Sequence, residues 1–368
     1  MASGYAKGRV TLSAFCGQMQ RDRFGVTALL NDIELDLVHT DQPVTFDYVH
    51  TLGVPLITPS PAVLRRRESL SVSNDVVFRY GMIEGDAVVE AQTAIYDPQS
   101  AFDARPFREN GSSATRLAIV LNRLEMETIT GTSHPDQGAR WLFENDQAEL
   151  VVLKMGAKGA LVMSRSGQTK IPLFASETVW KLGSGDVFSA TFATLWGVHG
   201  MSAEIAADFA SKATAWYCNS RALPPPNVEG LKNSAPIPIT SGRGCIYLAG
   251  PFFDLGQRWL IEEARLSLRD AGADVFSPVH EIGPGDAHVV APADLEGLEK
   301  CSVVLAILNG MDPGTVFEAG YAIKKGIPLV VLAENEKPED LKMFIGSGAI
   351  VTADFVTAIY KAIWALPK

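Results

Sequence analysis

The segment Cys245-Ile-Tyr-Leu-Ala-Gly-Pro-Phe-Phe253 is the clearest fold signal in the carboxy-terminal third of the chain. Its apolar first half predicts a short buried strand, and Gly250-Pro251 predicts the turn that ends this strand. We expect a helix to follow from about Gly256. A strand that stops at such a turn brings its last residues to the carboxyl edge of a sheet. This edge is where open α/β folds bind their ligands.

Similar short apolar runs occur elsewhere in the chain. Each is bounded by polar residues or glycine and predicts a strand buried on both faces, as in a parallel sheet. The runs are residues 150–153, 303–308 and 328–332. Segments of helical period lie between the runs, including 186–196 and 259–270. Alternating strands and helices predict an α/β architecture in both halves of the chain.

Length and composition indicate two ordinary globular domains. The chain has 368 residues, of which 20% are charged and 47% apolar, and this length exceeds what a single core usually holds. The boundary is expected where Pro224-Pro-Pro226 and a run of linker composition interrupt the pattern. We therefore predict one domain over residues 1–225, a proline-rich linker over 226–243 and a second domain over 244–368.

Charge and targeting signals narrow the class of protein. The formal net charge of −10 argues against a nucleic-acid-binding surface, and the basic run Arg65–Arg67 is interpreted as a solvated helix face. No apolar stretch approaches the ~20 residues needed to cross a membrane. Residues 1–8 lack the apolar core of a signal peptide. We therefore expect a cytoplasmic protein.

Cysteine and histidine usage points to neither disulfides nor a metal site. The four cysteines are far apart in the sequence, so we expect reduced, mostly buried thiols at Cys16, Cys218, Cys245 and Cys301. The six histidines do not cluster, and no structural metal is expected.

Four polar side chains of the second domain are expected to converge on one crevice. Asp312-Pro-Gly-Thr-Val-Phe-Glu318 follows a predicted strand and enters a helix that starts near Thr315. Asp294 lies on an earlier predicted helix, and Tyr247 lies on the first predicted strand. Cleavage of a C1′–N bond builds positive charge on the sugar, which one carboxylate can stabilise or capture. A second carboxyl group can protonate the departing base.

Each carboxylate also has an ordinary structural explanation. A glutamate in the first turn of a helix is a favourable charge at the positive end of the helix dipole. An aspartate before Pro-Gly commonly forms a turn. The occurrence of these residues together and in this order favours the functional interpretation.

This set of motifs resembles the nucleoside 2-deoxyribosyltransferase family across most of residues 244–368. The resemblance rests on Tyr247-Leu-Ala-Gly-Pro-Phe-Phe253, Phe276-Ser-Pro278, Asp294 and Asp312-x-Gly-Thr-x-x-Glu318-x-Gly. It implies a flavodoxin-like, Rossmann-like parallel-sheet domain that needs no cofactor and no metal. It also implies that Glu318 is the nucleophile on C1′ and that Tyr247 holds its carboxylate. Asp294 would handle the proton on the base, and Asp312 would bind sugar hydroxyls.

The resemblance implies further substrate contacts. They would come from Gly250, Pro251, Phe252, Phe253, Gly314, Thr315 and Met343. The family often has an asparagine two residues before a methionine, which it donates to a neighbouring subunit, so a homo-oligomer is expected. Here Leu341 stands in that place before Met343, which leaves the sugar contact and the exact substrate open. Arg258 could meet a 5′-phosphate or could be a solvated helix residue, and both interpretations stay open.

The first domain carries the glycine-rich segment Lys181-Leu-Gly-Ser-Gly-Asp186. Gly183, Ser184 and Gly185 stand just before a predicted helix, where their backbone N–H groups can form an anion site. Asp186 could take the proton from an attacking hydroxyl in phosphoryl transfer. Such loops also commonly do no more than cap helices.

Together with Asn122-Arg-Leu-Glu125 and Lys154-x-Gly-x-x-Gly159, this segment resembles the ribokinase-like (pfkB) carbohydrate kinase family across about residues 8–225. The resemblance implies an anion hole at Gly183, Ser184 and Gly185, with Asp186 as the base. Asn122 and Glu125 would help to organise magnesium and phosphate, and Lys154, Gly156 and Gly159 would flank ATP. Two features depart from the family. The chain begins near what would be the second strand, without the Gly-Gly motif that grips the sugar, and Trp180-Lys181 replaces an expected Asp-Thr.

The sequence therefore predicts an enzyme whose second domain cleaves or transfers the N-glycosidic bond of a nucleoside or nucleoside 5′-monophosphate. Two alternatives stay open for the first domain. It could phosphorylate a nucleoside or pentose with ATP and Mg²⁺, which would make a bifunctional salvage enzyme. It could instead sense a nucleotide and regulate the second domain. The expected partners are a small nucleoside or nucleotide and further copies of the chain, with no nucleic acid and no membrane.

Overall fold

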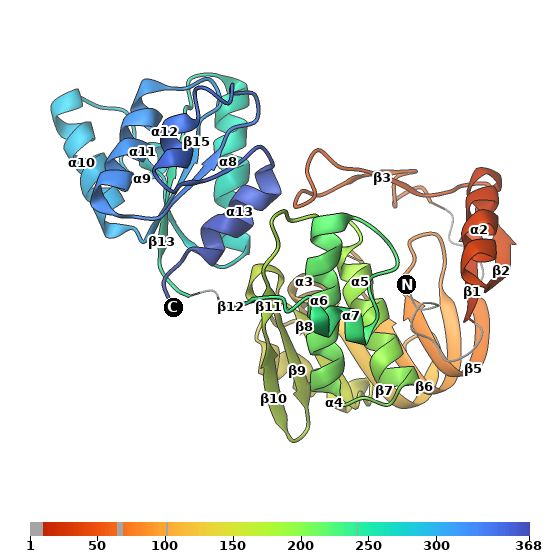
Figure 1. The fold of residues 1–368 in the computed structure, drawn as a ribbon. Helices are drawn as coiled ribbons and strands as arrows, with labels where there is room; N and C mark the ends of the chain where they lie inside the picture. Colours follow the sequence, from red (N-terminus) through yellow and green to blue (C-terminus); the bar gives the residue numbers. More distant parts are fainter. Residues whose placement is uncertain (1–9, 65–68, 101, 241) are drawn as a thin grey trace. The chain divides into compact units, whose positions relative to one another are not determined.

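The computed structural model describes residues 10–64, 69–100, 102–240 and 242–368. The predictions made for residues 1–8 and for Arg65–Arg67 lie outside these residues. The chain divides into two compact units, which are described separately (Figure 1). Unit 1 runs to Val49 and includes Gly53–Ala175 and Leu182–Ile237, and unit 2 consists mainly of Pro238–Lys368.

Unit 1 is built on a six-stranded mixed sheet of order β10-β9-β8-β7-β6-β5. The strands from β5 to β8 are parallel, and β8, β9 and β10 are antiparallel. The bounds of these strands are β5 Leu70–Tyr80, β6 Ala87–Asp97, β7 Ser113–Asn122, β8 Leu150–Lys154, β9 Ala160–Ser164 and β10 Gly167–Ile171. Two small sheets are separate from it: the parallel pair β1 Val10–Cys16 and β2 Ile33–His39, and the antiparallel pair β3 Thr45–Asp47 and β4 Leu56–Thr58.

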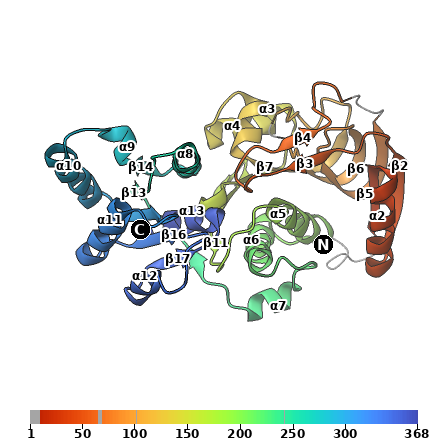
Figure 2. The same cartoon turned by 90° about the horizontal axis from the view of Figure 1, so that it is seen from above.

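Helices cover both faces of the six-stranded sheet. Figure 2 shows α3 and α4 on one side of the strands and α5 and α6 on the other. The helices and short segments of unit 1 are α2 Gln18–Asn31, α3 Arg123–Thr130, α4 Pro135–Asn145, η1 Gly156–Lys158, β11 Leu173–Phe174, α5 Ser184–Phe192, the π-helical turn η2 Ala193–Val198, α6 Ala203–Ser220 and α7 Val228–Asn233.

Unit 2 is a five-stranded parallel sheet of order β14-β13-β15-β16-β17. Counted along the unit this is the order 2-1-3-4-5, which is the flavodoxin-like arrangement expected from the sequence. Its elements are β12 Pro238–Ile239, β13 Cys245–Ala249, α8 Leu255–Asp270, β14 Asp274–Phe276, α9 Pro278–Glu281, α10 Ala287–Lys300, β15 Val303–Ile307, α11 Pro313–Lys325, β16 Leu329–Leu332, α12 Lys342–Gly346, β17 Ile350–Thr352 and α13 Phe355–Trp364.

The helices of unit 2 also lie on both faces of the sheet. In Figure 1, α8 and α13 lie on one side of the strands, and α10 and α11 lie on the other. The second of these faces holds a buried cluster, to which Tyr247, Val304, Leu298 and Ala319 belong. All five residues of β15 are buried, because a central parallel strand is covered on both faces.

The structure confirms the α/β class in both halves. The three runs predicted as buried strands form β8, β15 and β16, and the helix expected from about Gly256 begins one residue earlier, at Leu255. In unit 1, however, β5, β6 and β7 follow one another without a helix among the described residues between them. No helix of the described part of the chain is long and apolar enough to cross a membrane.

The segment predicted as a linker over 226–243 contains structure of its own. Asn227 caps α7 by accepting a hydrogen bond from the backbone N–H of Gly230. Leu231 is completely buried in unit 1. The linker-like composition of this segment did not indicate the short helix α7. Unit 1 includes this helix and extends to Ile237.

Candidate active site

The strand β13 brings Tyr247 to the face of the sheet that α10 and α11 cover. Its side chain is fully buried, and its ring stacks on Phe276 of β14 with 5.6 Å between the ring centroids. Its hydroxyl donates a hydrogen bond of 2.6 Å to Oε1 of Glu318. Because the phenol ring is held by packing, the hydroxyl has a defined position from which to orient the carboxylate.

Glu318 lies in the second turn of α11, which Asp312 caps. One oxygen of Asp312, Oδ2, accepts hydrogen bonds from the backbone N–H and the hydroxyl of Thr315, at 2.8 and 2.9 Å. Pro313 then starts the helix, where its missing N–H has no cost. The predicted start near Thr315 was two residues late. Asp312 therefore has a structural role as a helix cap, and its proposed contact with sugar hydroxyls stays a prediction.

Burial and the neighbouring polar groups shift the pKa of the Glu318 carboxyl group. Burial raises the pKa of Glu318 to about 7, the hydrogen bond from Tyr247 opposes this increase, and the charges of Asp294 and Asp312 add to it. Burial also raises the pKa of Asp294 on α10. Near neutral pH, Glu318 is thus divided between a carboxylate that can attack and an acid that cannot.

Asp294 has one feature that an ordinary helix residue lacks. Its Oδ1 is buried, with no hydrogen-bond partner among the described residues. An orphaned buried oxygen is costly unless a ligand or a proton satisfies it. This observation fits a group that handles a proton on a bound molecule, which is the role that the sequence resemblance implies.

The turn after β13 fixes the edge of the site. A Cβ atom at Gly250 would come within 2.5 Å of Ile261 Cδ1 and 3.2 Å of Ile307 Cβ, so only glycine fits without displacement. Pro251 is buried, whereas Phe252 and Phe253 are exposed and their rings stack on each other.

The other predicted substrate contacts differ in exposure. Thr315 is buried and Gly314 is exposed at the start of α11. Arg258 is exposed on α8, and Met343 is 77% exposed on α12. Their contact with a substrate stays a prediction, and the two interpretations of Arg258 are not resolved by its exposure.

In unit 1 the predicted anion site lies at the start of α5. Gly183 has φ +77°, and a Cβ atom there would lie 2.7 Å from the hydroxyl of Tyr217. Both the backbone conformation and the lack of space therefore favour glycine at this position. Asp186 lies in the first turn, and its Oδ1 accepts a hydrogen bond of 2.7 Å from Nε2 of Gln99. Burial raises the pKa of Asp186, and the nearby charge of Asp97 adds to this effect.

Behind Asp186 lies a buried polar network. The carboxylate of Asp97, completely buried at the end of β6, accepts hydrogen bonds from Nζ of Lys154 at 2.6 Å and from Oγ of Ser189 at 2.5 Å. Burial lowers the pKa of Lys154, but Asp97 and Glu125 outweigh that effect, and the pKa is raised overall. Lys154 is therefore a charged residue tied into the protein interior.

The predicted Asn122 and Glu125 motif forms a capping box at the start of α3. Oδ1 of Asn122 accepts from the N–H of Glu125 at 2.9 Å, and Oε2 of Glu125 accepts from the N–H of Asn122 at 2.7 Å. Burial raises the pKa of Glu125 to about 7, against the charge of Lys154. Gly156 and Gly159 have positive φ angles in the turn that joins β8 to β9 as a hairpin.

The two side chains proposed to organise magnesium each use one oxygen in the capping box. Asn122 and Glu125 bond each other's backbone, and no three His, Cys, Asp or Glu side chains in the described parts of the chain could together hold a metal ion. The roles of Asn122 and Glu125 toward magnesium and phosphate therefore stay a prediction.

Sequence reasoning did not identify Asp97 and Gln99. Asp97 is the last residue of β6 and Gln99 follows two residues later, in Asp97-Pro-Gln99. Polar residues at the end of a buried strand are a signal for the carboxyl edge. Gln99 also has φ +50°, an uncommon conformation for a residue other than glycine.

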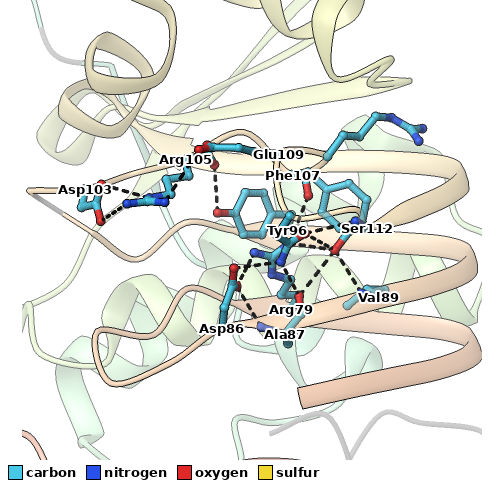
Figure 3. Close-up of polar contacts among 12 residues, drawn as sticks. Arg79, Asp86, Ala87, Val89, Tyr96, Asp103, Arg105, Phe107, Glu109 and Ser112 are labelled. Carbon is cyan, nitrogen blue, oxygen red and sulfur yellow. Dashed lines mark hydrogen bonds and ion pairs between the residues drawn. The ribbon is translucent and has the colours of Figure 1, made fainter. Parts of the chain in front are cut away.

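Unit 1 also contains a cavity of about 440 Å³ that no sequence motif predicted. Arg79 lines it and is almost fully buried, with bonds to Asp86 at 2.6 Å and to the hydroxyl of Ser112 at 3.1 Å. Its guanidinium lies 4.6 Å from the ring centroid of Tyr96. Figure 3 shows this cluster and the neighbouring pair of Arg105 with Asp103. Because both arginines are paired with carboxylates, the cavity is not an evident phosphate site.

Two family models match the chain. Residues 246–352 match the nucleoside 2-deoxyribosyltransferase model, and residues 95–226 match the model of the pfkB family of carbohydrate kinases. No curated protein matches the chain in sequence.

Solved structures resemble the two parts separately. A 2-deoxyribosyltransferase from Bacillus psychrosaccharolyticus is 30% identical over 30% of this chain and 88% of its own, with a TM-score of 0.28. A fructokinase from Vibrio cholerae is 18% identical over 63% of this chain and 87% of its own, with a TM-score of 0.43. A nucleoside kinase from Methanocaldococcus jannaschii is 12% identical over 63% and 82%, with a TM-score of 0.46. The assignment of the two parts to their families rests on the two family models.

Proposed function

The chain joins a pfkB-family carbohydrate kinase domain to a nucleoside 2-deoxyribosyltransferase-family domain, and from this premise we propose that unit 2 cleaves or transfers N-glycosidic bonds. Its substrate is a nucleoside or a nucleoside 5′-monophosphate. The observation that carries the proposal is the hydrogen bond of 2.6 Å between Tyr247 and Glu318, on a carboxyl group whose pKa is raised to about 7. A buried, oriented carboxylate of this kind suits attack on an electron-poor carbon.

The proposed reaction has two displacements. In the first, ionised Glu318 forms a bond to C1′ while the C1′–N bond breaks and its electron pair goes to the base. Asp294, whose pKa burial raises, supplies a proton to the departing base. In the second, water or another base attacks C1′, gives up a proton to the carboxylate that the first step left on Asp294, and releases Glu318 as its bond to C1′ breaks. Attack by water gives hydrolysis, and attack by a base gives transfer. Which acceptor reacts depends on its affinity for the site.

The positions of the carboxyl groups support a division of roles. Glu318 has a hydrogen-bond donor that favours its ionised form, whereas Oδ1 of Asp294 has no such donor among the described residues. Environments that differ in this way assign the nucleophile and the acid to different residues. Asp312 uses Oδ2 as a helix cap, and we assign its other oxygen to the sugar hydroxyls.

For unit 1 we propose nucleotide binding at the start of α5, by the backbone of Gly183, Ser184 and Gly185. Lys154 is paired with Asp97 and Glu125 is occupied in a capping box, which favours a binding or regulatory role over phosphorylation with ATP and Mg²⁺. ATP consumption in the presence of nucleosides or pentoses would favour the kinase. A thermal shift with ATP but no consumption would favour regulation.

We further propose that the two domains cover residues 1–225 and 244–368, that α7 in the segment between them belongs with the first, and that the protein is a cytoplasmic homo-oligomer. Sedimentation velocity of the full chain tests the association. A single species with the mass of one chain at all concentrations would contradict it.

The test of the glycosidic reaction is the release of free base, measured by chromatography. The panel contains ribonucleosides, deoxynucleosides and their 5′-monophosphates, each with and without an acceptor base. We expect release by the wild-type protein and loss of release in Glu318→Ala. Glu296→Ala is the matched control, because Glu296 is exposed on α10 and pairs only with Lys300 on the surface in the contacts described. Full activity of Glu318→Ala would refute the mechanism.

A further inference from the structure

Two cysteines that are distant in the sequence meet in unit 2. Cys245 is the first residue of β13, and Cys301 follows the last residue of α10, just before β15. Neither forms a disulfide, and their sulfur atoms lie 3.2 Å apart. The contact places two thiols within reach of one another in the folded protein.

The backbone around the two cysteines has the geometry that a disulfide requires. The N–H of Ser302 donates to the carbonyl oxygen of Cys245 at 2.8 Å, so Ser302 lies opposite Cys245 on the neighbouring segment. Cys301, one residue before Ser302, is therefore offset from Cys245 by one residue along that segment. A strand spacing of ~4.8 Å and a rise of ~3.3 Å give a Cα–Cα separation of about 6 Å. Disulfides have Cα–Cα separations of about 4.4–6.8 Å, so side-chain movement of about 1 Å can close the bond.

The two thiols differ in reactivity. Cys245 is partly exposed, whereas Cys301 is buried. The hydrogen bond from the Cys301 thiol lowers the pKa of Cys245, against the effect of burial, and raises the pKa of Cys301. An accessible thiol that ionises readily next to a buried partner is the arrangement of an attacking and a resolving cysteine.

The pair is also close to the candidate active site. Cys245 and Tyr247 are two residues apart on β13 and therefore point to the same face of the sheet. Tyr247 and Cys301 belong to one buried cluster, and Cys245 and Phe276 pack against it. Cys301 is the residue that ends α10, the helix that carries Asp294. A bond between the cysteines would thus join the strand of Tyr247 to the helix of Asp294.

We propose that Cys245 and Cys301 are a redox modification site that closes to a reversible disulfide by exchange with a small disulfide such as oxidised glutathione. The Cys245 thiolate attacks one sulfur of oxidised glutathione, whose S–S bond breaks to release one glutathione thiolate. The Cys301 thiol then loses its proton, and its thiolate attacks the Cys245 sulfur and expels the second glutathione. The two protein thiols are oxidised, and one glutathione disulfide is reduced to two thiols.

The consequence for activity rests on the proposed function. Closing the bond links β13 covalently to the end of α10 and restricts the adjustment of Tyr247 and Asp294 to the substrate, and misplacements of about 1 Å in an active site can cost up to roughly 10²-fold in rate. We therefore expect base release by the oxidised protein to fall at least several-fold and to recover with dithiothreitol.

The experiment maps thiols in the full-length protein and needs no enzymatic activity. Reduced protein is equilibrated in glutathione buffers of increasing oxidised fraction, quenched with an alkylating agent, and digested without reduction for mass spectrometry. We expect a peptide that links Cys245 to Cys301. Cys301→Ser should accumulate glutathione on Cys245, whereas Cys245→Ser should leave Cys301 unmodified. The double variant Cys16→Ser/Cys218→Ser is the control and should form the same linked peptide.

The outcomes separate the two proposals. Absence of the linked peptide from wild-type protein in fully oxidising buffer, or glutathione on Cys301 in Cys245→Ser, would overturn the redox site. A linked peptide with no change in base release would overturn its control of the active site. Failure to find any base release would leave the thiol mapping intact and would count against the proposed function alone.

Discussion

Replacing Tyr247 with phenylalanine removes one hydroxyl and should shift the pH dependence of the reaction. The hydroxyl donates to Glu318 at 2.6 Å and opposes the effect of burial on the pKa of that carboxyl group. A hydrogen bond to a charged group contributes about 1.5–3 kcal/mol, and 1.36 kcal/mol corresponds to one pH unit. The pKa of Glu318, about 7 in the wild-type protein, should therefore rise in Tyr247→Phe, and the acidic limb should move up by about one to two pH units.

The sign follows from which form of Glu318 reacts. Only the carboxylate attacks C1′, so the rate falls as pH drops through the pKa of Glu318. At pH 7 about half of the wild-type carboxyl groups are ionised, and in Tyr247→Phe the ionised fraction should decrease about 5- to 50-fold. Asp294 and Asp312 also face Glu318 and already raise its pKa, so neither compensates for the lost donor.

The assay is the pH profile of kcat/KM for base release from about pH 5 to pH 10. Tyr321→Phe is the control, because Tyr321 donates to the exposed Glu299 on the surface of unit 2. If Tyr247 positions and ionises Glu318, the variant approaches the wild-type rate at high pH. A rate lowered by the same factor at every pH would show that Tyr247 acts through packing alone, and the argument from its hydrogen bond would be refuted.

Three further predictions concern stability. The pKa of Glu318 in the folded protein, about 7, lies above its reference value of 4.5. The free-energy cost of burying its carboxylate is therefore absent at low pH, and it lowers the stability of unit 2 progressively as pH rises from 4.5 to 7. Glu318→Gln should therefore stabilise unit 2 by about 3 kcal/mol at pH 8 and change little at pH 4, as measured by calorimetry. Asp312→Ala should cost about 1 kcal/mol in urea unfolding through loss of the helix cap, and an equal stability would refute the capping role. Lys154→Met should destabilise unit 1 by about 3–5 kcal/mol because it leaves Asp97 buried and unpaired, and Lys154→Met/Asp97→Asn should recover part of that loss.

Local patterns predicted the α/β class and the central strands of unit 2, and the family resemblance implied their flavodoxin-like arrangement. Short apolar runs marked β15 and β16, and the turn at Gly250 marked the end of β13, because fully buried parallel strands need uninterrupted apolar residues. The same patterns located Glu318 near the carboxyl edge. The distance between Tyr247 and Glu318 could not be predicted from them, since it depends on how α11 packs against β13.

Three features of unit 1 show why some structural details could not be predicted from the sequence. Asn122-x-x-Glu125 is compatible with a capping box and with a phosphate motif, and only the packed structure distinguishes the two uses. The bonds of Asp97 to Lys154 and Ser189 join three distant segments, for which no local spacing rule exists. Leu231 is buried although its segment has the composition of a linker. One buried side chain in a six-residue helix is too short a pattern to detect in the sequence.

The two outer strands of the unit 2 sheet are each only three residues long, β14 at Asp274–Phe276 and β17 at Ile350–Thr352. A long, flat outer strand exposes a row of unpaired N–H and C=O groups that recruits strands from other molecules. Strands this short offer few such groups, so unit 2 presents little template for cross-β aggregation. Copies of the chain that associate through unit 2 should therefore meet through helical surfaces, and the sheet should end within each molecule.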